Sequence, residues 1–284
     1  MPKYEALSPV FTYSNDSAHL KEGRRIVLMM CIKCHYDAQT NTLAGGDVAN
    51  PGSIGDNFAS NITADSATGI GRWSTGQLAF FLRTGIKPDG YYVYDMPKYP
   101  GLSNDDLGSI IAFLRSDDSL VRAVNKPVAP EPINPVVKIF ARTLLRPYAY
   151  ATAAILPPDT NNPIEFGRYL APRKFSCYEC HSNDLVGNYH NDFPERSDNF
   201  FAGGAKHTNS EHGEIYSSNI TFDEETGIGK WSETEFLRTV KNGIKPDGKT
   251  VRDPMQPFYL LTDKEVLSIY AYLATLPRIH NKVR

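Results

Sequence analysis

Two copies of one short pattern, Cys-x-x-Cys-His, constrain this 284-residue chain more than any other feature. The first copy is CIKCH at residues 31–35, and the second is CYECH at residues 177–181. Two thiols at this spacing, followed at once by histidine, are typical of c-type haem attachment, in which the thiols add to the two haem vinyl groups. The adjacent histidine then lies beneath the iron as its proximal ligand. The residues predicted in this way are Cys31, Cys34, Cys177 and Cys180 for attachment, and His35 and His181 for iron.

Two other kinds of site use a CxxC pair, namely a redox dithiol and half of a zinc site, with a histidine next to it by chance. The recurrence of the complete motif makes both less favoured. The four motif cysteines are the only ones in the chain, so none remains for a disulfide, a nucleophile or a third haem. The sequence therefore predicts two covalently attached haem c groups.

Self-comparison indicates a tandem repeat. Residues 60–90 align with residues 218–248 at an offset of 158, and 17 of these 31 positions are identical. The two CxxCH motifs are offset by only 146, so the second copy carries twelve extra residues between Ser182 and Phe201. We expect this extra loop to shield the second haem or to form a docking surface, and to raise the potential of that haem.

Each copy has the sequence pattern of a mainly helical domain. A glycine precedes each haem motif on a predicted helix, where it lets another backbone approach closely. Ser74 and Ser232 open a second helix with capping boxes, and Ser103 and Thr262 resemble the same device before a third. Apolar residues at 107, 110, 111 and 114 then follow the spacing of a helix with one buried face. Pro-Asp-Gly at 88–90 and at 246–248 predicts a turn in each copy.

A proline-rich segment joins the copies and predicts an extended, semi-rigid strap. The expected organisation is a first domain at residues 1–123, a linker at residues 124–161 and a second domain at residues 162–284.

The sixth iron ligand decides the chemistry of a haem. Of the five methionines, Met1 is terminal, and Met29 and Met30 adjoin the first haem motif. Met96 and Met255 remain, one per copy, each in a polar, proline-containing loop before the last helix. A methionine is more often core filler, but this matched pair is predicted to bind the two irons.

The order of glycine-containing helix, CxxCH, tryptophan, methionine loop and amphipathic helix resembles class I cytochrome c. More narrowly, NITxDxxTGIGxWS followed by IKPDG resembles the cytochrome c subunits of membrane-bound alcohol, aldehyde and gluconate dehydrogenases. The resemblance covers residues 18–118 and 162–277. It implies two tandem class I lobes, His35/Met96 and His181/Met255 ligation, and electron transfer outside the cytoplasm.

Trp73 and Trp231, the only tryptophans, occupy equivalent positions. Core packing is one interpretation, and donation from the indole N–H to a haem propionate is the favoured addition to it. The polar loops that hold Thr63, Asp65 and their counterparts Thr221 and Asp223 could bind propionates or calcium. Calcium is the less favoured of the two, since most such loops cap only themselves.

Composition and charge limit the partners. A formal net charge of −2 argues against nucleic acid, which needs a clustered basic surface. No apolar run approaches the length of about 20 residues needed for a membrane span. Because haem attachment takes place outside the cytoplasm, we expect a periplasmic or extracytoplasmic protein, with membrane association only through an anchor outside the given chain.

The predicted function is outer-sphere electron transfer, because iron held by His and Met has no open position for a substrate. The partners would be redox proteins, such as a dehydrogenase, an oxidase or another cytochrome of a respiratory chain. The alternative is a dihaem enzyme such as a peroxidase or a thiosulfate-oxidising cytochrome. A peroxidase needs an open or displaceable sixth position, and a thiosulfate oxidiser of the usual kind needs a spare ligating cysteine, which this chain lacks.

Overall fold

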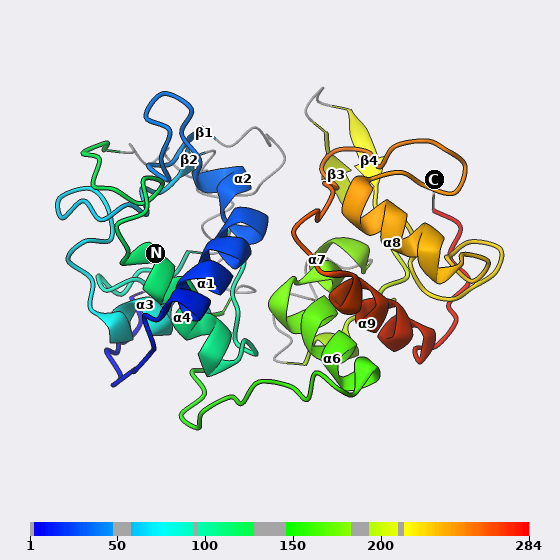
Figure 1. The fold of residues 1–284 in the computed structure, drawn as a ribbon, viewed down its shortest axis with the longest axis horizontal. Coiled ribbons are helices and arrows are strands. Elements are labelled where there is room, and N and C mark those ends of the chain that lie inside the picture. Colours follow the sequence, from blue (N-terminus) through cyan, green and yellow to red (C-terminus); the bar gives the residue numbers. More distant parts are fainter. Residues whose placement is uncertain are drawn as a thin grey trace. The chain divides into compact units, whose positions relative to one another are not determined.

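The structure is a computed structural model that describes residues 3–47, 58–93, 96–127, 146–182, 193–209 and 213–283. The chain divides into two compact units, Met1–Pro157 (unit 1) and Pro158–Arg284 (unit 2). Among the described residues, each unit consists of helices and loops with one small two-stranded antiparallel sheet (Figure 1). The helical character was predicted from sequence, whereas the two sheets were not.

Unit 1 contains four described helices and two short strands. In chain order they are α1 (Ser17–Met30), α2 (Ile32–His35), β1 (Gly46–Asp47), β2 (Phe58–Ala59), α3 (Thr75–Thr84) and α4 (Asn104–Leu114). The two strands pair with Gly46 opposite Ala59.

Unit 2 has the same order of main helices with additional short elements. They are α6 (Pro163–Tyr169), the π-helical turn η1 (Leu170–Lys174), α7 (Cys177–His181), the 3₁₀ turn η3 (Pro194–Arg196), β3 (Lys206–Thr208), β4 (Glu214–Tyr216), α8 (Glu233–Asn242) and α9 (Asp263–Ala274). Strands β3 and β4 pair with His207 opposite Ile215.

The predicted helix starts are confirmed. Ser74, Ser232 and Thr262 each close a reciprocal capping box at the start of α3, α8 and α9. Ser103 accepts a hydrogen bond from the Asp106 backbone N–H and so begins α4. The first turn of each helix is therefore fixed by local sequence.

The first and last helices of each unit pack against each other (Figure 1), and a glycine lies at each contact. In unit 1, Gly23 of α1 lies against the Ser109 carbonyl of α4, and a Cβ on the glycine would be only 1.8 Å from that oxygen. In unit 2, Gly167 of α6 meets the Ser268 carbonyl of α9 in the same way. The predicted role of these glycines, close backbone approach, is confirmed, and the crossing holds the helix that leads into each CxxCH motif.

Helix α4 is more completely buried than its one-sided pattern predicts. The N-terminal segment, residues 3–16, covers its outer face, and Gly108 lies against Tyr13 and Phe11. The same segment approaches α3 at Gly76, where the Pro9 carbonyl would lie 2.0 Å from a Cβ. Unit 1 thus carries a cover over its two later helices.

The described parts of the predicted linker are divided between the units, with residues 124–127 and 146–157 in unit 1 and residues 158–161 in unit 2. The Asn104 N–H donates to the Ile155 carbonyl at 2.8 Å, and the Tyr150 ring packs against Phe80 at 5.4 Å between centroids. The middle of this segment, residues 128–145, lies outside the described residues.

The helix that leads to the second haem motif is interrupted. Gly23 precedes Cys31 by eight residues, whereas Gly167 precedes Cys177 by ten. The π-helical turn η1, which contains Pro172, and the left-handed backbone of Ser176 (φ 48°) take up this difference. The second motif therefore begins on a new helical turn.

Candidate haem-attachment sites

Each CxxCH motif forms a single helical turn. Cys31 caps α1, and its carbonyl accepts hydrogen bonds from the Cys34 N–H at 3.2 Å and the His35 N–H at 3.0 Å. Cys177, Cys180 and His181 lie together on α7. The structure thus brings the predicted thiols and histidine of each motif onto one turn, as haem attachment requires.

The first thiol of each motif lacks the lowered pKa of a redox dithiol. Burial, with a smaller contribution from the neighbouring Cys34, raises the pKa of Cys31 to about 12. Burial likewise raises the pKa of Cys177 to about 12. In a redox CxxC site the pKa of the nucleophilic cysteine is lowered, so these environments disfavour that interpretation.

The two imidazoles are held in the same way. His35 Nδ1 lies 2.7 Å from the Ser60 carbonyl oxygen, and His181 Nδ1 lies 2.8 Å from the Ser218 carbonyl oxygen. A carbonyl only accepts, so Nδ1 carries the proton, and Nε2 is the nitrogen that can bind a metal. Burial lowers the pKa of both histidines, which favours the neutral imidazole that iron binds. These residues fit a proximal haem ligand.

Glycine brings the accepting carbonyl to the histidine. Gly45 has a left-handed backbone (φ 72°), and a Cβ on it would lie 2.7 Å from the Ser60 carbonyl carbon. The Gly45 N–H also donates to the His35 carbonyl at 2.9 Å. Gly203 repeats both features beside Ser218, with its N–H 2.7 Å from the His181 carbonyl.

Ser60 and Ser218 were not identified as functional residues from the sequence. Their contribution is a backbone carbonyl, which carries no side-chain signature. The sequence offered only an indirect indication. Each serine is the first residue of the repeated stretch and comes after a repeated Ala-Gly-Gly.

Met96 and Met255 occupy matched loops. Met96 lies between α3 and α4, Met255 lies between α8 and α9, and both are half-buried. A backbone hydrogen bond of 2.9 Å from the Met255 N–H to the Arg252 carbonyl closes a turn at the second methionine. Ligation of iron by either methionine stays a prediction.

The tryptophans are half-buried just before α3 and α8. The Trp73 ring meets Phe81 edge-on, with centroids 5.2 Å apart. The Arg115 guanidinium donates to the Trp73 carbonyl, whereas the Tyr270 hydroxyl donates to the Trp231 carbonyl at 2.7 Å. Packing and backbone anchoring thus position both rings, and donation to a propionate stays a prediction.

The polar loops considered for calcium cap themselves. Asp65 Oδ1 accepts from the Thr68 N–H and hydroxyl and from the Ala67 N–H. These hydrogen bonds lower the pKa of Asp65. Asp223 accepts the same bonds from Thr226 in unit 2. Within the described ranges, no group of three or more His, Cys, Asp or Glu side chains is placed to hold a metal ion.

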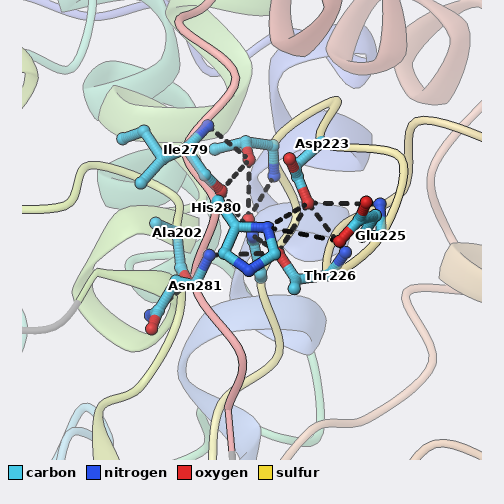
Figure 2. A network of polar contacts seen from close by, with 9 residues as sticks. Ala202, Asp223, Glu225, Thr226, Ile279, His280 and Asn281 are labelled. Atoms are coloured by element: carbon cyan, nitrogen blue, oxygen red, sulfur yellow. Dashed lines mark hydrogen bonds and ion pairs between the residues drawn. The ribbon is translucent and has the colours of Figure 1, made fainter.

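The chain end of unit 2 closes over this loop (Figure 2). The buried Asn219 amide donates to the Ile279 carbonyl at 2.8 Å and to the Thr226 hydroxyl at 3.0 Å. The Asn281 amide then reaches the Ala202 carbonyl at 2.9 Å, beside the glycine that supports His181. Asn61 makes the corresponding bonds in unit 1, to Thr68 and to the Val124 carbonyl.

Much of the extra loop predicted after His181, including Tyr189 and His190, lies outside the described residues. Its described end returns to the core of unit 2, where Phe201 is fully buried and Phe200 packs against Tyr178. Arg173 pairs with Glu195 at 3.2 Å.

No described helix has the length and apolar composition of a membrane span.

Comparison with known proteins finds several similar sequences. The chain is 27% identical over 265 residues to the fructose dehydrogenase cytochrome subunit of Gluconobacter japonicus, covering 87% of this chain and 50% of that protein. It is 29% identical over 242 residues to the cytochrome c subunit of alcohol dehydrogenase (quinone) from Gluconobacter oxydans, covering 80% and 48%. A diheme cytochrome c-type of Cereibacter sphaeroides is 26% identical over 262 residues, covering 88% and 82%.

This chain is related to c-type cytochromes. No family model matches it, and it spans about half the length of the first two relatives. The relatives are cytochrome subunits of dehydrogenases and a diheme cytochrome c, so they support the predicted electron-transfer function. They do not favour the alternative of a dihaem enzyme.

Proposed function

We propose that this chain is an electron-transfer cytochrome that carries one covalently attached haem c in each unit. The observation that carries the proposal is the twofold occurrence of a CxxCH turn whose histidine is oriented through Nδ1. His35 donates to Ser60 and His181 donates to Ser218, and each leaves Nε2 for iron. Haem c supplies a one-electron Fe(III)/Fe(II) couple when bound.

The two units would be tandem class I cytochrome c lobes. The shared order of helices, the glycine crossings at Gly23 and Gly167, and the matched caps support this proposal. Met96 and Met255 would be the sixth ligands, and Trp73 and Trp231 would donate to a propionate. A thioether ligand favours Fe(II) and leaves no open position, which suits electron transfer rather than catalysis.

The partner would be a membrane-bound dehydrogenase, with a respiratory acceptor downstream. The relatives that are cytochrome subunits of fructose and alcohol dehydrogenases support this assignment. The protein would work in the periplasm or elsewhere outside the cytoplasm, and any membrane anchor would come from outside the given chain. The lowered pKa of both histidines would keep the proximal nitrogen available at neutral pH.

Haem quantitation with spectroscopy tests the proposal. Denatured protein should retain two haems per chain through thioether bonds, and carbon monoxide should not alter the spectrum of the native reduced protein. The double substitution Cys31→Ser with Cys34→Ser should leave one haem, as should Cys177→Ser with Cys180→Ser. Haem that extracts freely into acidified organic solvent, or binding of carbon monoxide to both irons, would contradict it.

A further inference from the structure

The edge of one hairpin is paired in unit 1. Residues 86–92 form a hairpin around the Pro-Asp-Gly turn, and Lys3 pairs with Tyr91 across an antiparallel bridge. The Tyr4 N–H donates to the Gly90 carbonyl at 2.9 Å. The N-terminal segment therefore pairs with this edge through a single bridge, a short form of the contact made in β-augmentation.

The matching edge in unit 2 is open. Residues 244–250 form the same hairpin, with Ile244 bridged to Thr250. A Cβ on Gly90 would meet the Tyr4 carbonyl at 2.8 Å, whereas a Cβ on Gly248 would meet nothing within 4 Å. Among the described residues, no hydrogen bond reaches the Gly248 carbonyl or the Thr250 N–H.

The sequence of the open hairpin has basic residues where that of the paired hairpin has tyrosines. Lys249 replaces Tyr91 and Arg252 replaces Tyr94. The Lys249 side chain is 78% exposed, and it shares Asp247 with Lys245, at 3.6 and 3.9 Å.

A further arginine reinforces this charge. Arg238 takes the position of Phe80, and its guanidinium lies against the hairpin, 3.2 Å from the Lys245 carbonyl. Asp247 thus faces two lysines, with Arg252 just beyond the hairpin and Arg238 on the adjacent helix α8. The carboxylates beside the two arginines are Asp253 and Glu235, so the four cations exceed the carboxylates by one.

A cover like that of unit 1 cannot extend over α8 and α9. The N-terminal segment crosses unit 1 where Gly76 and Gly108 leave room for it. The equivalent positions in unit 2 are Thr234 and Leu267, which carry side chains where unit 1 has glycine. Contact at the open edge is therefore confined to the hairpin itself.

We propose that the hairpin edge at residues 244–252 docks an extended acidic segment of the redox partner. Backbone groups of Gly248 and Thr250 would pair with the segment, and the cations at 245, 249 and 252 would attract its carboxylates. This inference rests on the proposed electron-transfer function and assigns the partner contact to unit 2.

The test uses the reduced holoprotein and two synthetic probes. One is a blocked decapeptide of alternating Asp and Val, and the other has Lys in place of Asp. Calorimetry and backbone amide shifts should show binding of the Asp peptide alone, with shifts at residues 244–252. Raising the salt from 50 to 300 mM should weaken binding at least fivefold.

Substitutions distinguish the effect of the positive charges from that of backbone hydrogen bonding at the edge. The triple change Lys245→Glu, Lys249→Glu and Arg252→Glu should weaken binding at least tenfold, while the unit 1 control Lys87→Glu should leave it unchanged. Thr250→Pro removes an edge N–H without altering charge, and it should weaken binding at least threefold.

Equal binding of the Asp and Lys peptides would overturn the inference. An equal loss of affinity in Lys87→Glu, or amide shifts outside residues 244–252, would also overturn it. Haem content and reduction by a small soluble mediator are measured on every variant. These readouts report the proposed function, so the docking inference can fail while electron transfer stands.

Discussion

Gly23 and Ser109 touch where α1 crosses α4, and the glycine leaves no space for a Cβ, which would lie 1.8 Å from the Ser109 carbonyl oxygen. Gly167 and Ser268 repeat the contact in unit 2, at 1.9 Å. Because the obstacle is backbone, the clash can be relieved only by separating the two helices. Each crossing thus fixes the helix that presents a CxxCH motif.

Gly23→Ala should destabilise unit 1 by about 2–3 kcal/mol, the upper part of the range of about 1–3 kcal/mol expected for overpacking. Gly167→Ala should do the same to unit 2. Denaturant unfolding of the holoprotein, followed by circular dichroism and by the haem absorption of each lobe, measures both. Lys21→Ala, on the exposed side of α1, is the control and should change stability by less than about 0.5 kcal/mol. Normal stability of Gly23→Ala would mean that the helices separate at little cost.

Asn219→Ala should destabilise unit 2 by about 2–4 kcal/mol, since it removes several buried hydrogen bonds at once. The Asn219 side-chain N–H groups donate to the Ile279 carbonyl and the Thr226 hydroxyl. Its side-chain oxygen accepts from the Thr221 N–H and hydroxyl. Loss of these bonds should also release the chain end, detected as faster amide exchange at residues 279–283. Asn61→Ala should have the corresponding effect in unit 1 only. Unchanged exchange at the chain end would show that other contacts retain it.

His19 should make the stability of unit 1 depend on pH. Hydrogen bonds to Asp16 and then to Asp105 raise the pKa of this histidine. Protonated His19 therefore adds to the free energy of unfolding of unit 1 in full below the unfolded-state pKa of about 6.5. This stabilisation is lost as pH rises through the higher folded-state pKa. His19→Gln should flatten that part of the curve. Unit 2 has Pro163 at the equivalent position and serves as the internal control. An unchanged pH profile in the variant would contradict the assignment.

Met96→His should lower the potential of one haem by more than about 100 mV and leave the other near its starting value, because imidazole stabilises Fe(III) relative to a thioether. A spectroelectrochemical titration resolves the two transitions. Met255→His should affect the other haem. Met29→Leu, beside the first haem motif, is the control and should leave both potentials within about 30 mV. A titration curve that Met96→His does not alter would show that another residue binds the first iron.

Local features of the fold were predictable because they depend on neighbouring residues. The capping boxes at Ser74 and Ser232 needed only the side chain three residues further on. The Pro-Asp-Gly turns needed only glycine in a left-handed backbone, and Gly90 and Gly248 have φ of 84° and 79°. The partner of His35 was not predictable, because a carbonyl 25 residues away leaves no side-chain signal.

The sequence by itself determined the repeat and the prediction of haem attachment, since thiol spacing, the adjacent histidine and 17 identical residues are covalent facts of the chain. Only the tertiary structure decided which ring nitrogen of His35 and His181 would be available to the predicted iron, because that depends on where the Ser60 and Ser218 carbonyls lie. It also distinguished the two hairpin edges. Lys3 pairs with one, and the other stays open within its unit, because the order of the chain provides unit 1 with a free extended segment.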